Sequence, residues 1–317
     1  MKHLRRNLSE PAPVPEEGMR RALEIMQGGW LTRYGEFHGE GSEVAALERE
    51  FAYYMGARYA LAVNSCGAAL SIALLCAGVR PGTRVLVNAF TLAPVPGAVA
   101  HAGAEPVYVE CNDSYLVDLD DLERKARGDA KVLLLSHMRG HIADMDAVTA
   151  ICRRHGLVLI EDCAHTLGAN WNGTPSGRFG QFGCFSLQAY KHINAGEGGL
   201  LITDDEDAAA KAVLYAGSYM LYGQNGAAPG PEVFRRHDRS IPNLSCRMHE
   251  VTAAMARPQI GLLRERGLAW NHRYGKLAEL FSAIDGVSIP ERDAREGYVG
   301  SSIQVSIAGV PASRGGR

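Results

Sequence analysis

Short apolar segments alternate with longer amphipathic segments between residues 59 and 203, and this alternation constrains the fold more than any other feature of the chain. The apolar segments have the length of β-strands, and most of the segments between them have the periodicity of helices. The predicted strands cover residues 59–63, 84–87, 106–109, 131–136, 157–161, 184–186 and 199–203. Strands that alternate with helices favour a mostly parallel sheet with helices on both faces. We therefore expect a three-layer α/β/α domain.

The segments that flank this pattern extend the domain and begin a second one. They are predicted to form an extended arm over residues 1–15, helices over 16–27 and 43–55, a Gly-rich loop over 28–42, a long loop over 217–242 and a helix over 247–280. Pro258 is expected to kink the last helix. We expect a large domain over residues 1–245 and the start of a small α+β domain over residues 246–317. The small domain is expected to be incomplete, through either a missing segment or a natural reduction.

The charge and cysteine content exclude several classes of function. With 33 basic and 35 acidic residues, the chain lacks the positive charge that nucleic acids or anionic membranes attract. No apolar run reaches the ~18 residues of a membrane span, and the N-terminal residues lack the apolar core of a signal peptide. The seven cysteines form no CxxC pair, which favours a reduced, cytoplasmic protein, and we predict no metal site.

Two residues of opposite charge follow predicted strands. Asp162 follows the apolar segment LVLI, and open α/β sheets bind ligands at the carboxyl ends of their strands. A carboxylate there could hold a proton on a pyridine nitrogen, or it could cap a helix. Lys191 follows CFSLQAY and precedes the Gly-rich NAGEGG. Partial burial would lower the pKa of its amine, as a Schiff-base lysine requires, although most lysines are solvated surface charges.

Other candidates occur at neighbouring strand ends. Ser65, Cys66 and Gly67 lie at a strand-to-helix turn, where free backbone N–H groups favour an anion. The turn matches neither GxxxxGK[ST] nor GxGxxG, and an ordinary N-cap is the alternative. The remaining candidates are Phe90 to stack on a flat ring, His165 to reach a phenolic oxygen or orient the acid, and Ser186 to donate to a phosphate.

The order of these features resembles that of the fold-type I pyridoxal-phosphate (PLP) enzymes, and specifically the DegT/StrS family of sugar aminotransferases. The resemblance runs from about Pro11 to Ile303 and is most specific in EDCAHTLGA (161–169), FGCFSLQAYKHINAGEGGLLITDD (182–205) and RMHEVTAA (247–254). HMRGHIADMDAV (137–148) and GAEPVYVE (103–110) also match. The resemblance implies the PLP-dependent transferase fold, PLP as cofactor, and a homodimer in which each chain lends residues to the other's active site.

The resemblance also implies roles for individual residues. Lys191 matches the lysine that forms the internal aldimine, and Asp162 matches the partner of the pyridine nitrogen. His165 falls where the family has Gln or His near the phenolic oxygen. The other matches are Ser186, Cys66 and the backbone of Gly67 at the phosphate, and Gln188 as an active-site glutamine.

Three positions depart from the family pattern. The anion turn usually reads SGT, so Ser65-Cys66-Gly67 lacks a threonine hydroxyl. The ring-stacking aromatic usually follows a threonine, whereas Leu92 follows Thr91 here and Phe90 precedes it, so either could cover the ring. A cross-subunit phosphate contact usually comes from an Asn two positions before the arginine of RM. That position is Ser245 here and Asn243 is displaced by two, so either could replace the contact.

The implied reaction is the transfer of an amino group from glutamate or glutamine to a keto-sugar nucleotide or keto-cyclitol. Such reactions belong to amino-sugar, antibiotic and polysaccharide biosynthesis. A PLP-dependent sugar dehydratase is an alternative, although family dehydratases carry His where this chain has Lys191. A PLP-binding regulatory protein without turnover is another. The candidates to line the substrate pocket are Trp30, Tyr34, His38, Tyr219 and Arg236.

Overall fold

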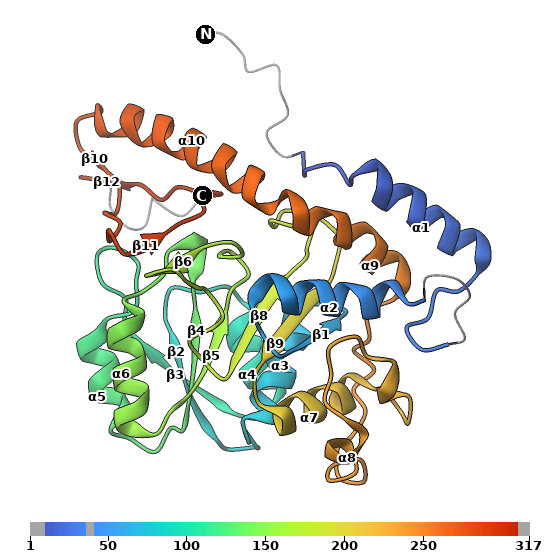
Figure 1. Cartoon of the computed structure of the whole chain (residues 1–317). Coiled ribbons are helices and arrows are strands. Elements are labelled where there is room, and N and C mark those ends of the chain that lie inside the picture. The colour runs from blue at the N-terminus through green and yellow to red at the C-terminus, as the bar shows by residue number, and fades with distance from the viewer. Residues whose placement is uncertain (1–9, 36–40, 310–317) are drawn as a thin grey trace.

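Seven strands form the central sheet of the structure, a computed structural model that describes residues 10–35 and 41–309 (Figure 1). In sheet order they are β1 (Tyr59–Val63), β9 (Gly199–Thr203), β8 (Phe182–Ser186), β5 (Val158–Asp162), β4 (Val132–Ser136), β2 (Arg84–Asn88) and β3 (Glu105–Val109). The five strands from β8 to β3 are parallel, whereas β9 is antiparallel to both β1 and β8. The predicted mostly parallel sheet is therefore confirmed.

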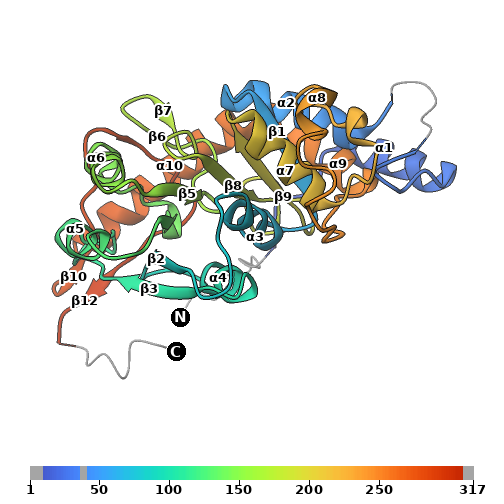
Figure 2. The ribbon, with the colours of Figure 1, turned by 90° about the horizontal axis from the view of Figure 1, so that it is seen from below.

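Helices cover both faces of this sheet, as the alternation predicts (Figure 2). One face carries α3 (Cys66–Cys76), α4 (Pro94–His101) and α7 (Glu206–Ala216), and the other carries α2 (Glu43–Met55), α5 (Leu119–Ala126), α6 (Met145–His155) and α9 (Glu250–Ala256). Successive residues of a strand enter opposite layers. In β4, Leu134 packs with α3 and α4, whereas Leu133 and Leu135 pack with α5 and α6.

Short polar residues decide where the chain leaves a strand or loop and begins a helix. The side chain of each accepts the backbone N–H three residues later, which replaces a hydrogen bond that the first helical turn cannot make. These caps are Ser42, Ser65, Asp118, Asp144 and Asp205. The capped turn at Ser65 matters most below, because it places the start of α3 at the carboxyl end of β1.

The chain after β9 contains more regular structure than the sequence predicts. The predicted loop over residues 217–242 includes a 3-10 turn, η2 (Tyr222–Gln224), and a short helix, α8 (Pro231–Phe234). The single helix predicted over 247–280 is α9, the 3-10 segment η3 (Arg257–Leu262) and α10 (Leu263–Ser282). Pro258 lies in the 3-10 segment, so the predicted break is confirmed.

Short strands and α1 complete the description. β6 (Asn170–Trp171) and β7 (Thr174–Pro175) form a hairpin that the sequence analysis did not predict, and β11 (Glu296–Gly297) pairs with β6. β10 (Val287–Ser288) pairs with β12 (Ser306–Ile307), within the part of the chain expected to begin a small domain. α1 (Glu16–Gly28) packs against α9 (Figure 1). The division of the chain at residue 245 stays a prediction.

One turn remains, η1 (Met138–Gly140), which follows β4 at the carboxyl edge of the sheet. Within the described ranges, no helix combines the length and the apolar character needed to cross a bilayer.

Candidate active site

Nine of the predicted site residues line one cavity at the carboxyl ends of the parallel strands. They end or follow the strands β1, β2, β5 and β8, and they are Ser65, Cys66, Gly67, Leu92, Asp162, His165, Ser186, Gln188 and Lys191. The cavity, which we call the Lys191 cavity, has a volume of about 420 Å³, within the usual range for a site that binds a small molecule.

Asp162 lies on the wall of this cavity as the last residue of β5. Its Oδ2 accepts a hydrogen bond from Ser136 Oγ at 2.8 Å, and its Oδ1 accepts one from the backbone N of Ala164 at 3.1 Å. Cys66 Sγ lies 3.9 Å from the same Oδ1. Burial raises the pKa of the carboxyl, and the hydrogen bonds from Ser136 and Ala164 oppose that rise. A carboxylate held in this way can keep a proton on a nitrogen placed against it.

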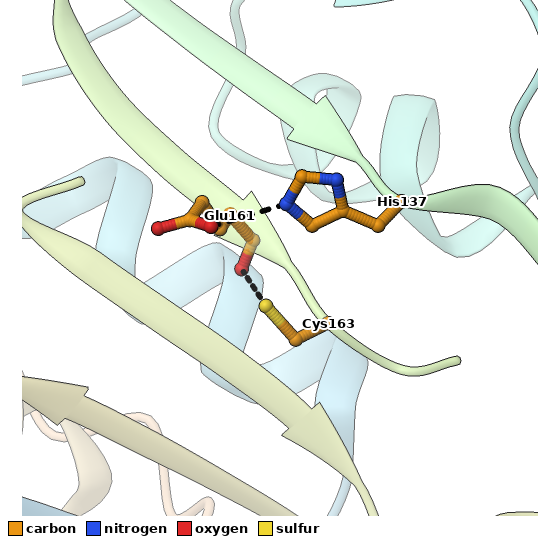
Figure 3. Close-up of side chains that lie close together, drawn as sticks. All are labelled: His137, Glu161 and Cys163. Atoms are coloured by element: carbon orange, nitrogen blue, oxygen red, sulfur yellow. Dashed lines mark hydrogen bonds and ion pairs between the residues drawn. The ribbon is translucent and has the colours of Figure 1, made fainter. Parts of the chain in front are cut away.

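A buried pair of residues lies at the neighbouring ends of β4 and β5, where His137 follows β4 and Glu161 precedes Asp162 (Figure 3). His137 Nε2 lies 3.1 Å from Glu161 Oε2, which also accepts the N–H of Gly177. Glu161 Oε1 accepts the N–H groups of Phe179 and Gly180. His137, Glu161 and Cys163 are close enough to hold a metal ion, but both carboxylate oxygens already have two partners each. We therefore interpret the cluster as structural.

Lys191 reaches into the cavity from the turn that follows β8. Its Nζ lies 3.0 Å from Nε2 of His165. Burial, the charge of Lys191 and the charge of Arg139 together lower the pKa of His165 to about 3, so this imidazole is neutral. Since an ammonium can only donate, His165 Nε2 accepts the hydrogen bond and the ring proton is on Nδ1. Burial also lowers the pKa of Lys191, against the attraction of Asp162.

The other end of the cavity is formed by the start of α3. Ser65 Oγ caps the helix by accepting the N–H of Ala68 at 3.0 Å. The N–H groups of Cys66 and Gly67 belong to the first turn, where a helix offers them no partner and its dipole attracts an anion. Ser186 Oγ accepts the N–H of Gln188 at 3.3 Å, which leaves its own hydrogen free to donate. This end offers neutral donors.

Gly199, the first residue of β9, allows the turn to approach the sheet. A Cβ atom at this position would lie 2.4 Å from the backbone carbonyl of Ser65 and 2.6 Å from the N of Cys66. A side chain there would displace the helix start, so the phosphate end depends on a glycine from a distant part of the chain.

The structure separates the two candidates for ring stacking. Leu92 lines the Lys191 cavity, whereas Phe90 does not. The Phe90 ring packs against Tyr115 with 5.2 Å between ring centroids, and its backbone N donates to Cys111 Sγ. The two residues point to different sides because they lie in a loop, where sequence spacing does not fix side-chain direction.

Asn243 and Ser245 lie outside the cavity and are exposed. Asn243 Oδ1 accepts the N–H of Ser245 at 2.7 Å and lies 3.2 Å from its hydroxyl. Ser245 has a left-handed backbone, with φ of 54°. The two candidates to replace the family's asparagine therefore interact with each other in one turn, and a contact of either with phosphate stays a prediction.

The structure does not bring the substrate-pocket candidates to the cavity. Trp30 and Tyr219 are exposed, and the Tyr219 ring lies under the guanidinium of Arg247. Tyr34 is buried and its hydroxyl donates to Asn225 Oδ1 at 3.2 Å. Arg236 forms ion pairs with Glu206 and Asp207 on α7. His38 lies outside the described residues. Their proposed contact with substrate stays a prediction.

Several lining residues were missed by the sequence analysis. Met138, Pro94 and Val95 contribute apolar surface, and Glu197 adds a carboxylate from the Gly-rich turn. An acid within NAGEGG was a visible signal for Glu197. No comparable signal existed for Ser136 or for the pair of His137 and Glu161, because their role depends on two strands becoming neighbours.

The cavity suits the polar groups of PLP. Asp162 offers a carboxylate to the pyridine nitrogen, and Lys191 offers an amine to the aldehyde. The hydroxyl of Ser186 and the N–H groups of the α3 start offer donors to the phosphate. All of these groups lie on the wall of one cavity, and their chemistry matches the three reactive ends of the cofactor.

Comparisons with known proteins agree with this geometry. Residues 14–313 match the DegT/DnrJ/EryC1/StrS aminotransferase family. GDP-perosamine synthase of Caulobacter vibrioides is 34% identical over 270 residues, which are 83% of this chain and 67% of the relative. L-glutamine:scyllo-inosose aminotransferase of Streptomyces griseus is 31% identical over 84% of this chain and 64% of the relative.

A solved structure shows the same fold. The crystal structure of 3-amino-5-hydroxybenzoic acid synthase superposes with a TM-score of 0.78 at 32% identity, over 90% of this chain and 73% of that protein. Together, the sequence match over nearly the whole chain and the shared fold identify this chain as a member of the DegT/DnrJ/EryC1/StrS family of PLP-dependent aminotransferases.

Proposed function

We propose that this enzyme transfers an amino group from glutamate or glutamine to a keto-sugar nucleotide or a keto-cyclitol. The observation that carries the proposal is the placement of Lys191, Asp162 and His165 on one cavity, with the lysine amine 3.0 Å from a neutral imidazole. The relatives support the substrate classes, because their names include a perosamine synthase and a glutamine-dependent cyclitol aminotransferase.

The roles of the residues follow from their positions. When bound, PLP supplies the electron sink on which amino-group transfer depends. Asp162 holds the proton of the pyridine nitrogen, and its buried setting strengthens that interaction. Lys191 Nζ removes the α-proton of the donor and later delivers a proton to the acceptor carbon that receives the amine. The lowered pKa of Lys191 makes it easier for its ammonium to lose the proton and become the amine that this role needs, and His165 orients the group.

Isotope transfer tests this proposal. The purified chain is reconstituted with PLP and incubated with glutamine labelled with ¹⁵N at the α-amine, together with a panel of keto-sugar nucleotides and keto-cyclitols. We expect ¹⁵N in an amino-sugar or amino-cyclitol product by mass spectrometry. Lys191→Ala should lower the rate by at least ~10³-fold, since it removes the group that moves the proton. Lys276→Ala, on the exposed side of α10, is the matched control. Full turnover by Lys191→Ala would contradict the proposal.

We further propose a homodimer in which each chain completes the partner's phosphate site. Two observations support it. Asn243 and Ser245 are exposed and lie outside the cavity of their own chain. A groove of about 690 Å³ between α3 and α4 meets the Lys191 cavity at Ser65 and Gly67. A second chain seated in this groove would reach the phosphate end of the cavity.

Subunit mixing tests the dimer. Lys191→Ala loses one essential group, and the double variant Asn243→Ala/Ser245→Ala loses the proposed contacts to the partner. In a mixed dimer one of the two sites has every residue intact, so mixing the two weak variants should restore about a quarter of wild-type activity. No recovery after mixing, or a monomer in light scattering, would contradict shared sites.

We also propose that the enzyme works in the cytoplasm. All seven cysteines are free thiols in the structure, which agrees with a reducing compartment.

A further inference from the structure

Arg139 carries a charge next to the Lys191 cavity that no group in residues 10–35 or 41–309 neutralises by an ion pair. It is the middle residue of η1, directly after Met138, which lines the cavity. Its side chain is exposed and, within the described residues, makes no hydrogen bond or ion pair. The other arginines near the site are engaged: Arg292 pairs with Glu296, Arg266 donates to His192 O, and Arg247 donates to Gly217 O.

The backbone at Arg139 and Gly140 has a left-handed conformation that a non-glycine residue seldom adopts. Arg139 has φ of 58° and Gly140 has φ of 83°, so two successive residues are left-handed. The carbonyl of Arg139 accepts Ser302 Oγ at 2.8 Å, and Gln304 Nε2 lies 3.4 Å from it. A non-glycine residue keeps this conformation only when its surroundings fix it, as they often do at functional sites. The C-terminal segment thus fixes where the guanidinium emerges.

The charge of Arg139 acts on both reactive bases of the cavity. It contributes to the lowered pKa of Lys191 and to the lowered pKa of His165. Arg139 does not itself line the cavity, but it is exposed and directly follows Met138, which does, so its guanidinium emerges at the rim of the cavity that holds both bases. The described lining of the cavity contains two carboxylates, Asp162 and Glu197, and Lys191 is its single cation. An anionic substrate needs a further positive group at this rim.

We propose that Arg139 binds the α-carboxylate of the amino donor, an inference that rests on the proposed aminotransferase function. In an amino acid, the α-carboxylate is attached to the carbon that carries the reacting amine, so it must lie next to Lys191 Nζ. A guanidinium matches a carboxylate with two parallel hydrogen bonds. The phosphates of a sugar nucleotide are separated from the reacting carbonyl by the sugar ring, which places them farther from Lys191. The position of Arg139 therefore favours the donor.

Two stable adducts can test this assignment without turnover. One is N-(5′-phosphopyridoxyl)-L-glutamine, and the other is the same adduct of 4-aminobutanamide, which lacks only the α-carboxylate. Their affinities for the PLP-free chain are measured by calorimetry. We expect wild type to prefer the carboxylate adduct by about ten- to a hundred-fold, the size of a charge-assisted pair of hydrogen bonds.

Variants at position 139 then test whether Arg139 is responsible for the preference for the carboxylate adduct. Asn tolerates left-handed backbone, so Arg139→Asn should fold and should lose the preference by weakening only the carboxylate adduct. Arg139→Lys should keep part of the preference for the carboxylate adduct. Arg84→Asn removes an exposed arginine paired with Asp129 at the far end of β2, and it should keep all of it. A full preference in Arg139→Asn, equal weakening of both adducts, or an effect confined to the sugar-nucleotide acceptor would each overturn the inference.

Failure of the proposed function gives a different result. If wild type binds neither adduct, the aminotransferase proposal fails and the role of Arg139 fails with it. If wild type binds both adducts and transfers ¹⁵N, but Arg139→Asn discriminates as well as wild type does, only the inference about Arg139 fails.

Discussion

The two ends of the Lys191 cavity differ in their hydrogen bonds. At the Asp162 end the acidic side chains are held by several hydrogen bonds, whereas the Ser65 end consists mainly of the first turn of α3. Asp162 has hydrogen bonds from Ser136 and Ala164, and the residue before it, Glu161, accepts four more. At the other end, the donors are two backbone N–H groups and one hydroxyl, and the usual threonine is missing. The residues of one chain thus fix Asp162 firmly at the end of the cavity where the reaction is proposed to occur, which we call the chemical end. They supply few hydrogen-bond donors at the end where the phosphate would bind.

The largest expected effect concerns the chemical end. Asp162→Asn keeps the shape of the side chain but removes the charge that holds a proton on the pyridine nitrogen. We expect the donor half-reaction to slow by about 10²- to 10³-fold, comparable to the loss of an electrostatic contact to a transition state. Stopped-flow spectra with glutamine measure the rate, and Asp129→Asn, on an exposed ion pair, is the control. An unchanged rate would show that Asp162 has no part in the chemistry.

The next effect concerns the burial of His192, the residue after Lys191. His192 is buried beside it, with its Nε2 3.2 Å from Ser301 Oγ, and burial lowers its pKa to about 4. Between pH 6.5 and 4 the unfolded chain binds a proton at this residue that the folded chain does not. Stability should therefore fall as the pH falls through this window, by up to about 3 kcal/mol for this residue.

Denaturant unfolding across this pH range checks the contribution. His192→Gln should flatten the pH dependence, whereas His101→Gln, on the exposed end of α4, should not. An identical pH dependence in wild type and His192→Gln would contradict the assignment. The contributions of His165 and His141, whose pKa values are also lowered, should remain in both variants.

A smaller effect is expected at the phosphate end. Gly199→Ala would push its Cβ to 2.4 Å from the Ser65 carbonyl, so the start of α3 must shift. We expect the Kd for PLP to rise by roughly 10- to 30-fold, equivalent to about 1.4–2 kcal/mol of overpacking. Gly275→Ala has open space around its Cβ and serves as the control. If PLP affinity is unchanged, the close approach of β9 to Ser65 does not matter for the cofactor.

The smallest expected effect is an increase in the affinity for PLP. Gly67→Thr restores the hydroxyl found at this position in the family, and a Cβ there meets only Ser65 Oγ at 3.8 Å. One extra hydrogen bond to a phosphate should tighten PLP binding about three- to ten-fold. Gly67→Val has a similar shape without the hydroxyl and should give no gain. Equal affinities for the two variants would indicate that the phosphate end is not limited by missing donors.

Much of the fold followed from the apolar periodicity, because a buried strand and its neighbouring helix both leave strong patterns. The direction of β9 did not, since an apolar strand of five residues looks the same in either orientation. The hairpin of β6 and β7 was missed because each strand has only two residues, although its Asn172-Gly173 turn was visible.

The site was predictable where chemistry depends on residue type. Lys191, Asp162 and His165 were found from their places after strands and from the family resemblance, and the structure places all three on one cavity. The choice between Phe90 and Leu92 depends on loop geometry, and the buried pair of His137 and Glu161 depends on the pairing of β4 with β5. Neither leaves a local pattern in the sequence.

The antiparallel pairing of β1 with β9 also affects when the cavity can form during synthesis. Tyr59 pairs with Thr203, about 140 residues later, so closing this contact costs roughly 1–2 kcal/mol more chain entropy than the other pairings of the central sheet. The turn at Ser65 lies between those strands and touches Gly199. We therefore expect that the Ser65 turn takes its final position only after β9, the last strand of the central sheet, has left the ribosome and joined β1.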